Sequence, residues 1–190
     1  MSSFIIETER LLLRPLEAED AEAVFQWVGD ERVSRYMVYN TYTEIGQVRK
    51  WLASLREPHD NYNFGFVRKE DGLLIGSGDI GPSDFYEGYW AFGYNFRHDC
   101  WGKGYATEAA KAMMRFAAEK FGITRFCSSH VAPNTASGHV MEKCGLSYVR
   151  DGHFTKLDGS CPMVSKEYEG TVDAAKFPMP VWKITPYPTY

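Results

Sequence analysis

The sequence lacks an excess of positive charge and any long apolar run. Its 190 residues hold 21 Lys and Arg against 25 Asp and Glu, a formal net charge of −4, which disfavours a protein that binds nucleic acid by neutralising phosphates. No stretch approaches the roughly 18 apolar residues of a membrane span. Residues 1–13 carry charges where a signal peptide has its apolar region. We therefore expect no nucleic-acid partner, no membrane contact and a cytoplasmic location.

Cysteine is scarce and scattered. The four cysteines, Cys100, Cys127, Cys144 and Cys161, form no C-x-x-C pair and have no histidine ladder beside them, a spacing that disfavours a zinc site. The sequence thus predicts buried free thiols in a reducing compartment and no metal. Aromatic residues, by contrast, make up 15% of the chain, and such side chains can line a pocket as well as fill a core.

Apolar periodicity predicts an α+β fold with the element order β-αα-βββ-α-β-α-ββ. Strand-like runs lie at 10–15, 63–68, 73–80, 89–96, 123–131, 148–155 and 163–168, and helical spacing lies at 20–28, 43–58, 105–121 and 135–144. Residues 31–42 show no clear periodicity. Beyond Gly170 four prolines lie among aromatic residues, so we expect one domain over residues 1–170 and an extended tail over residues 171–190.

The most informative segment is the glycine-rich turn WGKGYATE at residues 101–108, which follows a predicted strand and opens a predicted helix. Such a turn points free backbone N–H groups and the positive end of the helix at an anion. It is not a Walker A loop, because Tyr105 follows Gly104, and it is not a dinucleotide fingerprint, because Thr107 stands at the last glycine position. The alternative is a strand-to-helix turn that binds no ligand.

Gly93 and Tyr94, followed by WGKGYATEA, resemble the acyl-CoA pyrophosphate loop of the GNAT superfamily of N-acetyltransferases. The superfamily pattern is Q/R-x-x-G-x-G/A. Gly104 and Ala106 match it, and Trp101 replaces the first residue, as is common in the branch that resembles the RimJ/RimL ribosomal-protein alanine N-acetyltransferases. A second family block, N-x-x-S followed by E-K-x-G-F/L, resembles residues 134–146. Together with the opening residues 7–24, the resemblance covers about residues 7–168.

The resemblance implies a central, mostly antiparallel sheet that is flanked by helices and splayed between the fourth and fifth strands. It also implies acetyl-CoA as cosubstrate, with the pyrophosphate on the backbone amides of residues 102–107 and the pantetheine arm along the fourth strand. The candidate cofactor residues are Tyr94, Asn95, Phe96, Trp101, Gly102, Lys103, Gly104, Tyr105, Ala106, Thr107, Asn134, Ser137 and Lys143. The resemblance implies that Asn134 hydrogen-bonds the pantetheine, and the alternative is a helix N-cap. It implies that Lys143 meets the 3′-phosphate, and the alternative is a solvated lysine.

The residues that move the proton follow less directly from the resemblance. Family enzymes often place a glutamate on the fourth or the fifth strand and a tyrosine on the last helix, and those positions hold Ala91, Ser129 and Met141 here. The substitutes that the sequence offers are His130, Ser137, Asp79, Asp84 and Glu87. We expect no single carboxylate to be indispensable and the amine to lose its proton through water, with His130 the best side-chain contributor because its ordinary pKa is near 6.5, and Ser137 to protonate the thiolate. The alternatives are a structural histidine, solvated carboxylates and a serine that only contacts the pantetheine.

The function implied is an acetyl-CoA-dependent N-acetyltransferase, in which a bound primary amine of a protein N-terminus or a small molecule attacks the thioester directly. The alternative is a non-catalytic acyl-CoA-binding module, which the changes at Ala91, Ser129 and Met141 motivate. The expected partners are acetyl-CoA and the amine, bound by a monomer or a homodimer. The resemblance places the amine side at residues 32–42 and 156–161, and the aromatic and basic composition of residues 32–42 favours a flat or carboxylate-bearing amine.

Overall fold

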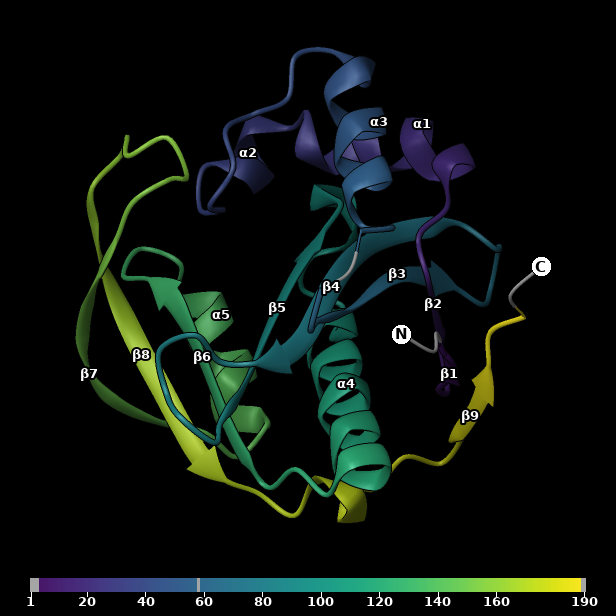
Figure 1. Ribbon diagram of the computed structural model, residues 1–190, viewed down its shortest axis with the longest axis vertical. Coiled ribbons are helices and arrows are strands. Elements are labelled where there is room, and N and C mark those ends of the chain that lie inside the picture. The colour runs from purple at the N-terminus through teal and green to yellow at the C-terminus, as the bar shows by residue number, and fades with distance from the viewer. Residues whose placement is uncertain (1–3, 58, 189–190) are drawn as a thin grey trace.

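Figure 1 shows the computed structural model, which describes residues 4–57 and 59–188. These residues form one nine-stranded sheet in the order β7-β8-β6-β5-β4-β3-β2-β1-β9. The strands are β1 (Phe4–Glu7), β2 (Leu11–Arg14), β3 (Tyr62–Arg68), β4 (Leu74–Pro82), β5 (Trp90–Phe96), β6 (Arg125–Val131), β7 (Ser147–Phe154), β8 (Met163–Thr171) and β9 (Lys183–Pro186). Neighbouring strands run antiparallel, except β5 and β6, which run parallel. The predicted α+β class is confirmed.

Five α-helices lie among the described residues. They are α1 (Ala21–Val28), α2 (Glu31–Ser34), α3 (Ile45–Ser54), α4 (Tyr105–Phe121) and α5 (Thr135–Lys143). Each strand and helix predicted between residues 10 and 168 is present, with small shifts at the ends. Pro58, which was predicted to end the second helix, lies outside the described residues.

Two strands and one α-helix among the described residues were not predicted: β1, β9 and the one-turn helix α2. Strand β9 comes from the proline-rich tail and pairs antiparallel with β1, with Phe4 opposite Pro186. Figure 1 shows β9 at the edge of the sheet beside β1, a position where a proline costs little because no further strand needs its N–H. The tail therefore contributes to the sheet, while a domain boundary at residue 170 stays a prediction.

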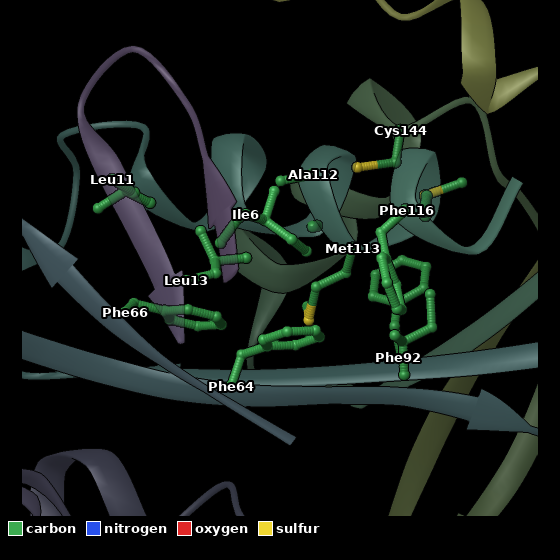
Figure 2. Packing of buried hydrophobic residues seen from close by; sticks show 14 of the residues in the cluster. Ile6, Leu11, Leu13, Phe64, Phe66, Phe92, Ala112, Met113, Phe116 and Cys144 are labelled. Atoms are coloured by element: carbon green, nitrogen blue, oxygen red, sulfur yellow. The ribbon is translucent and has the colours of Figure 1, made fainter. Parts of the chain in front are cut away.

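Helix α4 packs on one face of the sheet and builds the main core. Its Met113 and Phe116 point toward Phe64 and Phe92 of the sheet (Figure 2). The opposite face is covered over β4 by α1 and α3, whose buried residues include Trp27, Val48 and Leu52. Side chains of i, i+3 and i+4 spacing share one face of a helix, so these apolar stripes fix the helices on the two faces of the sheet.

Candidate active site

Strands β5 and β6 separate shortly after they meet. Within the described residues they pair only at Trp90 with Phe126 and at Ala91 with Cys127, and Figure 1 shows the two strands diverging beyond that point. A cleft of about 880 Å³ opens there, lined by β4, β5, β6, the start of α5, the loop before β5 and part of β7 and β8. The splay expected between the fourth and fifth predicted strands is thus present.

The glycine-rich turn lies between β5 and α4 and has the backbone geometry of an anion site. Gly102 and Gly104 have φ angles of 74° and 81°, a left-handed conformation that is strained for other residues. The backbone N–H groups of Trp101 and Glu108 donate hydrogen bonds to backbone carbonyls. Those of residues 102–107 donate none among the described turn and loop bonds. Since the first N–H groups of a helix have no partner within it, these amides are available to a ligand.

Glu108 fixes this turn to the N-terminal hairpin. Its Oε1 accepts hydrogen bonds from Thr8 Oγ1 at 2.7 Å and from the Arg10 amide at 2.8 Å, and its Oε2 pairs with Arg10 Nε at 2.7 Å. Arg10 also donates to the carbonyl of Lys103 and lies over the ring of Tyr105. The arginine thereby neutralises the carboxylate and leaves the turn's amides free for an anion.

Three of the predicted cofactor residues meet at the splay. The Tyr94 hydroxyl of β5 lies 2.9 Å from Ser137 Oγ of α5, and burial raises the pKa of the Tyr94 phenol, so that it stays protonated at neutral pH. Asn134 occupies the N-cap of α5, yet its side chain makes no capping hydrogen bond and lines the cleft. All three side chains are therefore placed where a cofactor arm can reach them.

The other predicted cofactor residues are distributed more widely. Trp101 Nε1 donates to the carbonyl of Phe96 at 3.0 Å, and the Phe96 ring is buried against Phe66. Asn95 faces the opposite side of β5, where its Oδ1 accepts from Ser77 Oγ at 2.9 Å. Lys143 is exposed on α5 and is not among the described residues that line the cleft.

Asp79 is a predicted proton acceptor that lines the cleft. It lies on β4 directly opposite Gly93 of β5, and a Cβ at Gly93 would stand 3.3 Å from Asp79 Oδ1. Burial raises the pKa of Asp79 to about 6, although a hydrogen bond from Asn61 and the charge of His59 act in the opposite direction. A carboxylate with such a pKa can take a proton from an amine and release it near neutral pH.

His130 lies at the border of the cleft, and Glu87 lies outside its described lining. The His130 ring borders the cleft but lies on the α5 face of the sheet, where Nδ1 is 2.8 Å from the Val131 carbonyl and the ring packs against Tyr168. Its Nε2 is buried and has no hydrogen-bond partner among the described residues. Glu87 is exposed in the loop before β5, and the described cleft lining does not include it.

Sequence reasoning missed Glu167 of β8, which lines the cleft. Its Oε2 accepts from the Tyr86 hydroxyl and pairs with Arg150 Nε at 2.9 Å, and Arg150 also donates to the Tyr86 hydroxyl. Glu167 lies directly opposite Ser129 of β6. No sequence motif marks Glu167, because only the register between β6 and β8 brings it beside Ser129.

Lys156 was also missed as an individual residue. Its side chain is buried, with 7% exposed, and Nζ donates to the carbonyls of Ser34, Met37 and Tyr39 at 2.9, 3.1 and 2.7 Å. The Leu157 amide donates to a fourth carbonyl, that of Val38, at 2.8 Å. These bonds hold the two segments expected on the amine side, 32–42 and 156–161, against each other.

Residues 10–147 match the acetyltransferase (GNAT) domain family. The chain belongs to the GNAT acetyltransferase family. The N-acetyltransferase p20 of Bacillus licheniformis, itself uncharacterized, is 28% identical over 148 residues, which cover 76% of this chain and 82% of p20. The predictions of the family and of an acetyltransferase are therefore confirmed, and the catalytic interpretation is favoured over a binding module.

Solved GNAT structures share the fold. An acetyltransferase from Bacillus anthracis superposes with a TM-score of 0.75 at 25% identity, covering 88% of this chain and 98% of that one. The ribosomal L7/L12 N-acetyltransferase RimL, solved with coenzyme A, superposes with a TM-score of 0.73 at 18% identity and covers 90% and 99% of the two chains. The chain thus has the GNAT fold predicted from its sequence, shared with RimL among other acetyltransferases.

Cys100, Cys127 and Cys144 are free and buried, as predicted, whereas Cys161 is free but exposed, so the prediction of a buried thiol is wrong at that position. No described helix combines the length and apolarity needed to cross a membrane. Residues 4–57 and 59–188 hold no group of three or more His, Cys, Asp or Glu side chains that could ligate a metal ion.

Proposed function

We propose that this protein transfers the acetyl group of acetyl-CoA to a primary amine bound in the β5–β6 cleft. The observation that carries the proposal is the junction of two features: unpaired backbone amides at residues 102–107 and a cleft that begins where β5 leaves β6. The amides suit a pyrophosphate, and the cleft suits a peptide-like arm that adds to a strand edge. The coenzyme A in the RimL structure supports the same cosubstrate here.

In this proposal the cofactor residues keep the roles that the resemblance implied. The pyrophosphate lies on the amides of residues 102–107, the pantetheine follows the β5 edge, and Asn134 uses its uncapped side chain to bind the pantetheine. Lys143, exposed on α5, is the candidate for the 3′-phosphate. The acetyl thioester then lies near the Tyr94 and Ser137 hydroxyls.

The reaction needs a base for the amine and an acid for the thiolate. The amine nitrogen attacks the carbonyl carbon of the thioester, the C–S bond breaks, and the amine proton passes to Asp79 directly or through water. The thiolate takes a proton from Ser137, whose hydroxyl is hydrogen-bonded to the protonated Tyr94 phenol. Asp79 replaces His130 as our preferred base, because the His130 ring lies on the α5 face and Asp79 faces the cleft.

Thiol release tests this function. Purified protein with acetyl-CoA and a panel of amines and peptide N-termini should release free CoA and yield acetylated amines by mass spectrometry. Binding of CoA without release of thiol above background for any amine would establish a non-catalytic acyl-CoA-binding module instead. Our proposal retains the predicted cytoplasmic location and the monomeric or homodimeric state, and gel filtration checks the latter.

A further inference from the structure

Two carboxylates flank the splay in one row across the sheet. Asp79 of β4 is opposite Gly93 of β5, and Ser129 of β6 is opposite Glu167 of β8. Ala91 pairs with Cys127 in the parallel β5–β6 segment, so Gly93 and Ser129, two residues further along, face each other across the opening. Directly opposite residues point to the same face of a sheet, and all four row residues line the cleft. The two central residues of the row, Gly93 and Ser129, are small, and the two outer residues are acidic.

Glu167 lines this cleft and has one carboxylate oxygen without a hydrogen-bond partner among the described residues. Its Oε2 is occupied by Tyr86 and by Arg150, whereas Oε1 has no hydrogen-bond partner among the described residues. A Cβ at Gly152 would lie 2.1 Å from Oε1, so the glycine leaves the space that Oε1 occupies. The Arg150 side chain is 58% exposed, which lets solvent screen its charge. Glu167 is thus fixed in orientation and can still accept a hydrogen bond from a ligand.

The mouth of the same cleft is apolar. Phe85 and Leu157 line it with 90% and 84% of their surface exposed, and Val38 lines it with 46% exposed. Large apolar side chains exposed around a cleft are typical of a surface that contacts an apolar ligand. Arg32 and Arg35, which favoured a carboxylate-bearing amine in the sequence, are exposed and do not belong to the described cleft lining.

We propose that the acceptor is a primary amine with an apolar body and no carboxylate beside the amine, and that Glu167 selects it by accepting a hydrogen bond from its cationic form. This inference rests on the proposed function and specifies its substrate class. The acceptor enters with its ammonium group between the two acidic ends of the row, and its apolar body lies against Phe85, Leu157 and Val38. A carboxylate on the carbon that bears the amine would enter a cleft with Asp79 on one side and Glu167 on the other. There it is repelled by Asp79 and by that part of the Glu167 charge that Arg150, also in the cleft lining, does not neutralise.

The test compares 2-phenylethylamine with L-phenylalanine, which differ only by the carboxylate. With saturating acetyl-CoA, the wild type should prefer the amine by at least about tenfold in kcat/KM. Glu167→Gln should reduce this preference at least about threefold, mainly through a higher KM for 2-phenylethylamine, and should leave the KM for acetyl-CoA unchanged. The matched control is Glu169→Gln, because Glu169 lies on the same strand but is not in the described cleft lining. It should behave as the wild type.

Each outcome decides the proposal. A preference for phenylalanine, or a Glu167→Gln variant that matches Glu169→Gln, overturns it while thiol release continues. No thiol release with any amine overturns the proposed function and this inference with it. If Glu167→Gln does not fold, Glu167→Asp replaces it: the variant keeps the charge but withdraws Oε1, so it should still raise the KM for the amine, and an unchanged KM would overturn the role of Glu167.

Discussion

Replacing Asp79 by Asn should make the protein more stable and less active. The carboxamide keeps the shape of the side chain and can still accept the hydrogen bond that Asn61 donates to Asp79 Oδ2 at 3.1 Å. What it removes is a negative charge in a partly buried position opposite Gly93. The substitution therefore separates the electrostatic role of Asp79 from its packing.

The gain in stability follows from the raised pKa. Burial moves the pKa of Asp79 from 3.8 to about 6 in the folded protein, and one pKa unit corresponds to about 1.4 kcal/mol. The ionised carboxylate thus costs the folded state about 3 kcal/mol at pH 7, and this cost develops as the pH rises from about 4 to about 6. Asp79→Asn should exceed the wild type in free energy of unfolding by about that amount at pH 7, and the difference should vanish below pH 4. Urea unfolding at both pH values measures it.

The loss of activity has its own pH signature. If an ionised Asp79 must take the proton from an amine that binds as its cation, log kcat/KM for the amine should rise with a slope of about one below pH 6 and be level above it. Asp79→Asn should show a slope of about one throughout and a kcat/KM lower by at least about a hundredfold. The control is Glu87→Gln, because Glu87 lies outside the described cleft lining. The assignment is wrong if Asp79→Asn keeps the wild-type rate and slopes while His130→Ala loses the activity.

Most helices and strands could be predicted from the sequence, because the residue patterns that specify them lie within each element. Helix α4 was predicted at residues 105–121 and occupies Tyr105–Phe121, since its apolar stripe is long and Gly122 ends it in a left-handed conformation. Strand β9 was not predicted, because the prolines around it indicated an extended tail, and its four residues form a strand by pairing with β1. A short edge strand in a proline-rich tail has its cause elsewhere in the chain.

In the candidate site, too, local sequence patterns were recognised and contacts between distant residues were missed. The turn at residues 101–107 was recognised because its glycines and the following helix are contiguous in sequence. Glu167 and Lys156 were not recognised, because their roles depend on partners far away in the chain: Tyr86 for the glutamate, and the carbonyls of residues 34–39 for the lysine. The preference for His130 over Asp79 followed from ordinary pKa values, and burial, which the sequence does not reveal, changes that of Asp79.

Three further predictions test the cofactor turn, the pantetheine contact and the amine side. Gly104→Ala has space for its Cβ, 3.4 Å from the nearest atom, but the left-handed backbone costs alanine about 1–2 kcal/mol, so CoA binding measured by calorimetry should weaken about tenfold. The control is Gly72→Ala, which is also left-handed but lies in a distant turn, and it should bind CoA as the wild type does. Asn134→Ala should raise the KM for acetyl-CoA without lowering Tm, because Asn134 makes no capping bond, and a loss of Tm alone would contradict the pantetheine role. Lys156→Met should lower stability by about 2–3 kcal/mol, because three carbonyls within residues 34–39 lose a charged donor in a buried position. Since those carbonyls belong to the segment that forms the amine side, the KM for the amine should rise while the KM for acetyl-CoA stays constant, and an equal rise in both would show that Lys156 supports the whole cleft rather than its amine side.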